Sequence, residues 1–263
     1  AQRLVLRLDL DMQDIKESST HLQLAGYTAP QGELTSITLQ AQGRLRGHVI
    51  DLALDAGGTQ ATANLRGAYM KNIWTGRLHD SELRSGTAGV WRLENPAALV
   101  AGAEEISLAQ GCLSREAGRI CAQGNWRRTL GWNVTASARH FPLSLMQPLF
   151  QQDIGLTGSM DADVVARAPY AGTSSATIGL RLSPGSVRHP ARGEHQVQVD
   201  YDTASATLQA KQGRSQSHLS VRLKNQGTLD ASLAFPLNLS GTTAPADASL
   251  QGDINASLHD LSP

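Results

Sequence analysis

Residues 4–12 read Leu-Val-Leu-Arg-Leu-Asp-Leu-Asp-Met, with an apolar residue at every even position and mostly charged residues between them. Successive side chains of a β-strand point to opposite faces of the sheet, so this alternation places the even-numbered side chains together on one face. A helix would instead need apolar residues at intervals of three and four. The stretch therefore predicts a β-strand with one aliphatic face and one polar face.

The same period of two recurs along the whole chain, around Leu52, Leu180, Val199, Val221 and Ala231. Glycines and short turn sequences such as Pro184-Gly185 separate these stretches, with no long helical window between them. Turn signals spaced by about 8–12 residues are typical of antiparallel strands in sequence order. The sequence predicts an all-β protein in which residues 1–263 form one continuous segment of a longer chain.

The composition leaves two all-β architectures open. Aromatic residues make up only 4% of the chain, so Leu, Val, Ile and Ala must provide nearly all the apolar surface. The strands could pack as an ordinary β-sandwich with a dry core. They could instead form an elongated, twisted antiparallel sheet, folded into a taco-like trough with an aliphatic interior. Such a trough would give acyl chains an apolar surface without specific polar contacts.

The trough prediction assigns one face of the alternating strands to its lining, with Arg167 and Arg181 turned to water. The predicted lining residues are Leu4, Leu6, Leu8, Leu10, Ile50, Leu52, Leu54, Val164, Ile178, Leu180, Leu182, Val197, Val199, Leu219, Val221, Leu223, Leu229 and Leu233.

One segment departs from the alternation. Leu145, Met146, Leu149 and Phe150 are spaced as on one side of a helix, and Pro142 suits a first helical turn. Pro148 would limit the length of the helix, because it removes an internal hydrogen bond. We expect a short helix near residues 141–151 that covers an end or edge of the sheet. A membrane-surface helix is disfavoured because the segment lacks a basic face.

The chain has two cysteines, Cys112 and Cys121, with the turn formers Ser114 and Gly118 between them. They could face each other on neighbouring strands, and they have no histidines at a zinc-site spacing. We predict a disulfide, which would imply an oxidising compartment such as the bacterial periplasm. Two buried free thiols are the alternative.

The sequence contains no recognisable catalytic or nucleic-acid-binding pattern. Its eight histidines are scattered, and paired carboxylates such as Asp161 and Asp163 belong to the polar faces of strands. There is no Gly-x-Ser-x-Gly elbow, P-loop or dinucleotide fingerprint. The chain has 23 basic and 23 acidic residues, without the basic excess that nucleic-acid binding requires. We therefore expect a protein that is not an enzyme, holds no metal and binds no nucleic acid.

Neither a spanning helix nor a signal peptide is expected. No run of about 18 apolar residues occurs that could cross a membrane as a helix. The N-terminal residues lack the basic and apolar regions of a signal peptide.

Several segments occur in an order that resembles the TamB family, the inner-membrane subunit of the translocation and assembly module of Gram-negative bacteria. They begin with Trp74-Thr-Gly-Arg-Leu-His-Asp-Ser-Glu-Leu and Val90-Trp-Arg-Leu-Glu-Asn-Pro-Ala-Ala-Leu. The cysteine pair follows, with Trp126 and Trp132 after it. The proline-initiated helix at Phe141 and the segment Leu156-Thr-Gly-Ser-Met-Asp-Ala complete the series. The resemblance covers roughly residues 60–260.

The resemblance implies a periplasmic body, anchored in the inner membrane by an N-terminal helix and partnered by a TamA-like Omp85 barrel in the outer membrane. It also implies a taco-like sheet that transfers phospholipid, or assembles and secretes outer-membrane β-proteins such as autotransporters. No cofactor is implied, and phospholipid or detergent are the molecules such a groove would hold. The alternative is a structural β-solenoid or passenger-type scaffold without lipid binding, although no fixed repeat period is present.

Overall fold

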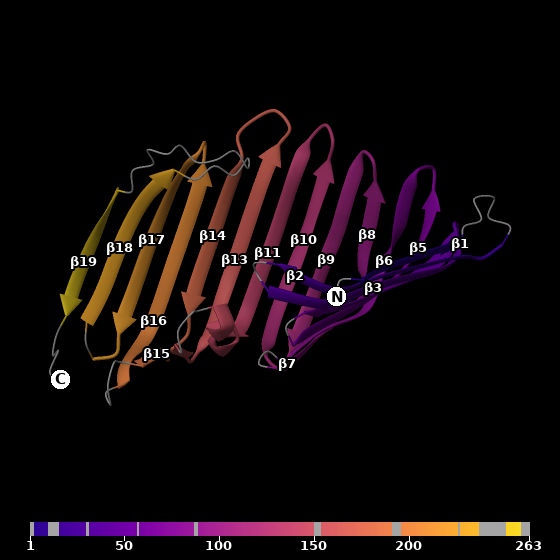
Figure 1. Ribbon diagram of the computed structural model, residues 1–263. Helices are drawn as coiled ribbons and strands as arrows, with labels where there is room; N and C mark the ends of the chain where they lie inside the picture. Colours follow the sequence, from indigo (N-terminus) through magenta and orange to yellow (C-terminus); the bar gives the residue numbers. More distant parts are fainter. Residues whose placement is uncertain are drawn as a thin grey trace. The chain divides into compact units, whose positions relative to one another are not determined.

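Alternating apolar and polar residues form long antiparallel strands in this protein. The computed structural model describes residues 3–9, 16–29, 32–56, 58–86, 89–149, 154–190, 196–225, 227–236 and 251–258. These residues form nineteen strands, assigned to one sheet, and one short 3₁₀-helix (Figure 1). The prediction of an all-β antiparallel fold is confirmed.

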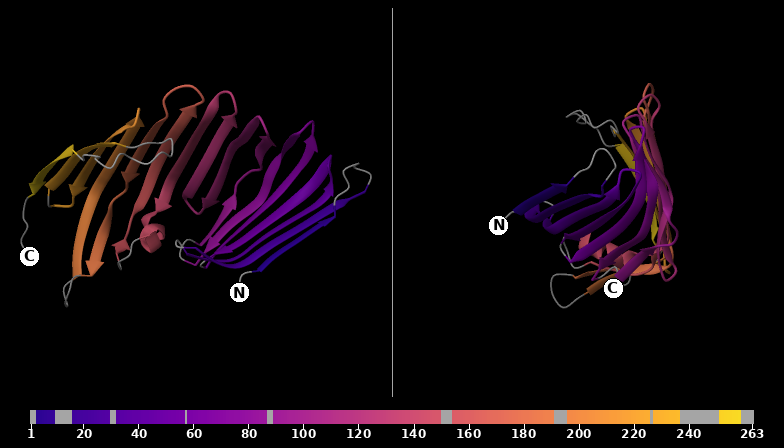
Figure 2. Two further views of the ribbon diagram at one scale, coloured as in Figure 1. Left: turned by 45° about the horizontal axis from the view of Figure 1, so that its top comes forward. Right: turned by 90° about the vertical axis from the view of Figure 1, so that its right-hand side faces the viewer.

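The chain divides into two compact units. Unit 1 comprises residues 1–116 and 121–128, and unit 2 comprises residues 117–120 and 129–263. In Figure 2 the strands of unit 1 run from indigo to magenta and those of unit 2 continue to yellow. Each unit is described by itself below.

Unit 1 consists of strands that pair antiparallel with their neighbours in sequence. Its strands are β1 (Arg3–Asp9), β2 (Ser18–Ala29), β3 (Gly32–Arg44), β4 (Gly47–Ala56), β5 (Thr59–Met70), β6 (Ile73–Ser85), β7 (Gly89–Leu93), β8 (Ala97–Gly102), β9 (Glu105–Arg115) and most of β10 (Gly118–Arg127). Strand β6 pairs with β8 along its first half and with β7 along its second half. Pro96 lies between β7 and β8 and cannot donate to a ladder, which accounts for the interruption.

Unit 2 is also built of antiparallel strands, but three of its pairings join strands that are not consecutive in sequence. Its elements are β11 (Gly131–Pro142), η1 (Leu143–Leu149), β12 (Gly155–Leu156), β13 (Ser159–Pro169), β14 (Ser175–Leu182), β15 (Gly185–Pro190), β16 (Gln196–Lys211), β17 (Arg214–Leu223), β18 (Gly227–Pro236) and β19 (Gln251–Leu258). The long strand β16 pairs with β15 along its first half and with β14 along its second half. From β16 to β19 the strands lie side by side in sequence order (Figure 1).

The only described helix is shorter than expected and is not an α-helix. It is a 3₁₀-helix over Leu143–Leu149, whereas we predicted a helix near 141–151. Pro142 ends β11 instead of opening the helix. Pro148 lacks an N–H and so prevents a continuous α-helical ladder in this short segment. Residues 150 and 151 lie outside the described part of the chain.

Few side chains are fully buried among the described residues. Within each unit, the elements in extensive contact are hydrogen-bonded strand neighbours, together with η1 against β12. The buried apolar residues are Leu65, Trp91, Ala97, Cys112, Cys121, Leu143, Tyr201, Ala204 and Ala210. Burial therefore comes mostly from neighbouring strands and from η1.

Candidate functional site

Strand register brings aliphatic side chains of unit 1 to one face of its sheet. Leu6 pairs with Leu22, which continues to Leu39, Leu52 and Ala63 on successive strands. Residues directly opposite each other in an antiparallel pair project on the same side. This row therefore crosses β1 to β5 without a polar side chain.

A second and a third row flank it in unit 1. The row through Leu4 continues to Leu24, Ile37, Leu54 and Ala61. The row through Ile50 continues to Leu65, Leu78 and Ala97. We call the surface formed by these three rows the aliphatic face of unit 1.

Unit 2 has an aliphatic face of the same construction. Leu180 pairs with Ala206, which continues to Leu219 and Ala231. The parallel rows run from Val164 to Ile178 and Leu208, and from Leu182 through Ala204 to Val221 and Leu229.

A β-bulge at Asp202 keeps the apolar side chains of β16 on one face along the whole strand. The register of β16 against β17 shifts between Tyr201 and Thr203, so one residue of β16 has no partner there. An extra residue reverses which positions point to a given face. Val197, Val199 and Tyr201 therefore share the face of Ala204 and Ala206, although their numbers differ in parity.

The predicted lining residues lie on these two faces, with different exposures. Leu4, Leu6, Leu8, Val197 and Leu219 are exposed, by 68%, 55%, 56%, 53% and 38%. Leu10 lies outside the described residues. The other predicted residues are half-buried, and Arg167 and Arg181 are exposed on the opposite face of unit 2. Contact of any of these residues with a ligand stays a prediction.

Helix η1 covers part of the unit 2 face. Leu143, Tyr201 and Ala204 form a buried cluster, against which Met146 and Leu156 pack together with three predicted lining residues. These three are Leu182, Val221 and Leu223. The chain itself therefore occupies this stretch of the face. The apolar spacing of residues 145–150 indicated a helix. That spacing did not indicate which strands the helix would cover.

Hydrogen bonds hold the residues after η1 on this face. The Tyr201 hydroxyl donates to the Thr157 carbonyl at 3.1 Å, and its burial raises the pKa of Tyr201. Thr157 Oγ1 lies 2.9 Å from Ser186 Oγ, and Ser159 Oγ lies 2.8 Å from Ser183 Oγ. Bonds among hydroxyls and backbone groups keep these polar atoms satisfied next to an apolar cluster.

Gly185 allows the close approach of this segment. A Cβ at Gly185 would lie 2.6 Å from the Tyr201 hydroxyl and would also collide with the Thr157 carbonyl. Any larger residue there would separate the Thr157 segment from Tyr201.

The two cysteines are joined in unit 1. A disulfide connects Cys112 on β9 with Cys121 on β10, with the Cα atoms 4.1 Å apart. Both side chains are buried. The bond ties together the two strands that flank the Glu116 turn.

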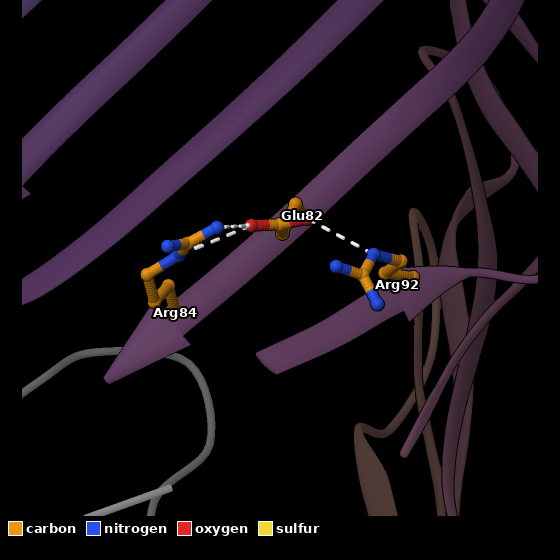
Figure 3. A network of polar contacts seen from close by, with 3 residues as sticks. All are labelled: Glu82, Arg84 and Arg92. Carbon is orange, nitrogen blue, oxygen red and sulfur yellow. Dashed lines mark hydrogen bonds and ion pairs between the residues drawn. The ribbon is translucent and has the colours of Figure 1, made fainter. Parts of the chain in front are cut away.

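Charged side chains gather on the polar faces, in small networks. Glu82 on β6 lies between Arg84 of the same strand and Arg92 of β7 (Figure 3). The hydrogen bond from Arg84 is the main cause of a lowered Glu82 pKa. In unit 2, Arg139 donates to Asp163 at 2.6 Å and to the Ala162 carbonyl at 2.8 Å, and the bond to Asp163 raises the pKa of Arg139. In these networks each carboxylate is paired with arginine side chains. None of them places a nucleophilic side chain beside a general base.

A hollow of about 460 Å³ lies on the polar side of β16 to β19. Amide and hydroxyl side chains such as Gln209, Gln216 and Ser232 line it. It is open and mixed in polarity, so it differs in chemistry from the aliphatic faces.

The described ranges contain neither a candidate metal-binding cluster nor a candidate membrane-spanning helix. No group of three or more His, Cys, Asp or Glu side chains there is arranged to hold a metal ion. No helix in that part of the chain is long and apolar enough to cross a membrane.

The fold and the two faces define a class: an antiparallel β protein whose long strands present one aliphatic and one polar surface. The chain matches the family model described as TamB, N-terminal domain, over residues 1–263. The protein therefore belongs to the TamB family, as the order of its sequence segments indicated. Searches of curated proteins and of solved structures gave no significant match.

Proposed function

We propose that the aliphatic faces bind the acyl chains of phospholipids, and that the protein acts without catalysis as a periplasmic bridge between the inner and outer membranes. The observation that carries this proposal is the run of aliphatic rows in both units, with most of their side chains half-buried or exposed. A dry sandwich core would bury them. An acyl chain would remove this surface from water.

The hydrophobic effect supplies the affinity in this proposal. Each methylene group moved from water to an apolar surface contributes about 0.8 kcal/mol. The faces hold few polar groups that could select among lipids by hydrogen bonding, so acyl binding would be tolerant of chain identity. No cofactor is needed for such a role.

Membership of the TamB family supports the cellular setting of the proposal. We propose that the intact protein is anchored in the inner membrane of a Gram-negative bacterium and works with a TamA-like Omp85 barrel. Lipid transfer and the assembly of outer-membrane β-proteins such as autotransporters are both compatible with this setting. A disulfide between Cys112 and Cys121 is compatible with an oxidising compartment.

The test is capture of lipid at defined positions in cells. A photo-crosslinking residue at Leu180, on the aliphatic face, should capture phospholipid. The same residue at Arg181, on the opposite face of the same strand, is the matched control and should not. Equal capture at both positions, or none at either, would overturn the proposal in favour of a scaffold without lipid binding.

A further inference from the structure

Helix η1 lies on the aliphatic face of unit 2, at the place where strand β16 changes its partner. Strand β16 pairs with β15 up to Tyr201 and with β14 from Ala204 onward, and the bulge at Asp202 lies between them. Leu143 of η1 packs with Tyr201 and Ala204, which stand on either side of this bulge. The helix therefore covers a stretch of the face to which both halves of β16 contribute.

The residues at η1 continue the aliphatic rows that lead away from it. Leu182 stands directly opposite Ala204 and packs against the buried cluster of η1. Leu180 points to the same side of β14 and lies about 7 Å further along the strand. Apolar side chains thus run without interruption from Leu180 to the helix. We call five residues of β14, β16 and β17 in this cluster the covered stretch: Leu182, Tyr201, Ala204, Val221 and Leu223.

Apolar contacts hold η1 on the covered stretch. The helix has the sequence Leu-Ser-Leu-Met-Gln-Pro-Leu, without a charged residue. Leu143 is 6% exposed, and Met146 is half-buried against the same cluster. The Leu143 N–H also donates to the Gly158 carbonyl at 3.0 Å, which ties the start of the helix to the strands. Beyond this bond, the hydrophobic effect accounts for the position of the helix.

A 3₁₀-helix of 7 residues has little stability of its own. Its hydrogen bonds have poorer geometry than those of an α-helix, and Pro148 has no N–H to donate. Isolated helices shorter than about 12 residues are marginal in water. Away from the covered stretch, η1 would therefore lose its hydrogen-bonded form.

Polar bonds hold the floor of the covered stretch without using η1. The Thr157 N–H donates to the Ser186 carbonyl at 3.0 Å, and the Tyr201 hydroxyl donates to the Thr157 carbonyl at 3.1 Å. The Ser159 N–H donates to Ser183 Oγ at 2.8 Å. These bonds join the segment around β12 and β13 to β15 and β16. The floor can keep its shape when the helix leaves, so a binding surface would remain.

The contacts of η1 are of the kind that an acyl chain makes. Both bury apolar atoms against the same aliphatic side chains, and the stabilisation grows with the apolar area removed from water. An acyl tail is a longer row of apolar atoms than Leu143 and Met146 provide. A tail that lies along the row through Leu180 would meet η1 at Leu182 and compete with it for the covered stretch.

We propose that the covered stretch is an acyl-chain site of unit 2, and that η1 occupies it in the absence of lipid and leaves when an acyl chain enters. This inference rests on the proposed lipid-binding function and adds a discrete site with a displaceable cover to it. The cover keeps apolar side chains out of water while no lipid is bound. A ligand that binds only the uncovered form shifts the population toward that form.

Hydrogen exchange separates a displaceable helix from a fixed one by the sign of the response. The full chain, freed of lipid, is measured before and after loading from vesicles of phosphatidylethanolamine and phosphatidylglycerol. Amides of residues 143–149 should exchange about five-fold faster after loading, the equilibrium factor for the net contribution of one hydrogen bond. Amides of β17 are the control and should not exchange faster. Equal or slower exchange of residues 143–149 in the loaded protein would overturn the proposal.

Photo-crosslinking at two positions of β14 then locates the lipid. A diazirine side chain at Leu180 reports on the open row, and one at Leu182 reports on the covered stretch. Below saturating lipid, Met146→Ser should raise capture at Leu182 by about five-fold, as expected for loss of a half-buried methionine side chain. Capture at Leu180 should not change. Ser144→Ala, at an exposed position of the same helix, is the matched control and should alter neither.

The outcomes distinguish this inference from the function on which it rests. If Leu180 captures no lipid in any of these proteins, the proposed function itself fails. If Leu180 captures lipid but Leu182 does not respond to Met146→Ser, only the exchange of η1 for an acyl chain is overturned. Circular dichroism checks that the variants fold. If Met146→Ser does not fold, hydrogen exchange of the unaltered protein decides the question.

Discussion

At the scale of single residues, Trp74 packs against two glycines and donates a hydrogen bond to a histidine. Its ring needs two glycines beneath it, and its nitrogen needs His48 as an acceptor. Trp74→Phe keeps most of the apolar area but leaves His48 Nε2 without its donor. We expect a loss of about 1 kcal/mol in the free energy of unfolding, the usual net contribution of one hydrogen bond. Urea denaturation measures it.

A glycine substitution tests the same arrangement from the other side. Gly67→Ala places a methyl group 2.5 Å from the indole and 2.6 Å from the Thr75 carbonyl, so the ring must move. It should destabilise by about 1–3 kcal/mol and shift the tryptophan fluorescence. Gly47→Ala is the control, because a Cβ there meets nothing within 4 Å. Equal effects of the two substitutions would contradict the packing of Trp74 described here.

Glu82 gives a prediction about pH. Arg84 donates to its Oε1 from Nη2 at 2.7 Å and from Nε at 3.2 Å, which lowers the carboxyl pKa below its ordinary 4.5. A lowered folded-state pKa contributes stability that is present above the unfolded pKa and is lost as pH falls through the folded value. The contribution should therefore disappear only in acid, below about pH 4.

Arg84→Ala should bring the Glu82 pKa back toward its ordinary value, as followed by carbon NMR during an acid titration. Arg77→Ala, which removes another exposed arginine of β6, should leave it lowered. A Glu82 pKa that does not respond to loss of Arg84 would contradict the assignment of its cause.

At the scale of elements, η1 stabilises the part of unit 2 that it covers. Leu143 is 6% exposed and packs with Tyr201 and Ala204. Leu143→Ala should cost about 2–5 kcal/mol, since it removes buried methyl groups and leaves a cavity. Ser144→Ala, at the exposed neighbouring position, should change stability by less than about 0.5 kcal/mol. Similar small effects at both positions would mean that η1 does not pack on this face in solution.

The disulfide between Cys112 and Cys121 also acts at the scale of elements, because it connects β9 to β10. It closes a loop with a sequence separation of 9 between two adjacent strands. Replacing both cysteines by serine should lower stability by about 2–3 kcal/mol in the chain-entropy model. Denaturation of the oxidised protein and of the double variant measures the difference. If both cysteines react with an alkylating reagent in the absence of reductant, the prediction of a disulfide is wrong.

Alternation in the sequence predicted the strands well because each keeps one face apolar. Alternation did not show how a strand keeps its apolar side chains on one face where its register shifts. In β16 the apolar positions change from Val199 and Tyr201 to Ala204 and Ala206, and this change of parity is the trace of the bulge at Asp202. The type and length of the helix were harder to predict from the sequence. Its apolar spacing also fits an α-helix, and its length depends on Pro148. Its packing on Tyr201 depends on contacts between residues far apart in sequence, which local patterns do not encode.

The candidate site was predictable to the same extent. Residues such as Leu52 and Leu180 could be assigned to aliphatic faces from alternation alone. The packing of η1 over Leu182, Val221 and Leu223 could not be predicted in this way. Helix η1 lies more than thirty residues before the nearest of these three residues in the sequence. Likewise, the pairing of Trp74 with His48 joins β6 to β4 across an intervening strand.

At the scale of the whole molecule, the pattern of contacts predicts how the protein unfolds. Within each unit, extensive contacts join hydrogen-bonded neighbours, as in repeat proteins. Stability should then be a sum of local terms, and strand pairs should be lost in stages. A single cooperative transition, typical of small domains with one shared core, is not expected.

Two probes should reveal these stages during urea denaturation. Three of the four tryptophans, Trp74, Trp91 and Trp126, lie in unit 1 and Trp132 lies in unit 2, so fluorescence reports mainly on unit 1. Far-UV circular dichroism reports on strands of both units. Their transitions should differ in midpoint, and hydrogen exchange should show protection that varies between strand pairs. Trp132→Phe should leave the fluorescence transition nearly unchanged, because it removes the only probe in unit 2. If both probes instead followed one transition with a slope expected for all 263 residues, the strands would be coupled far more strongly than their contacts indicate.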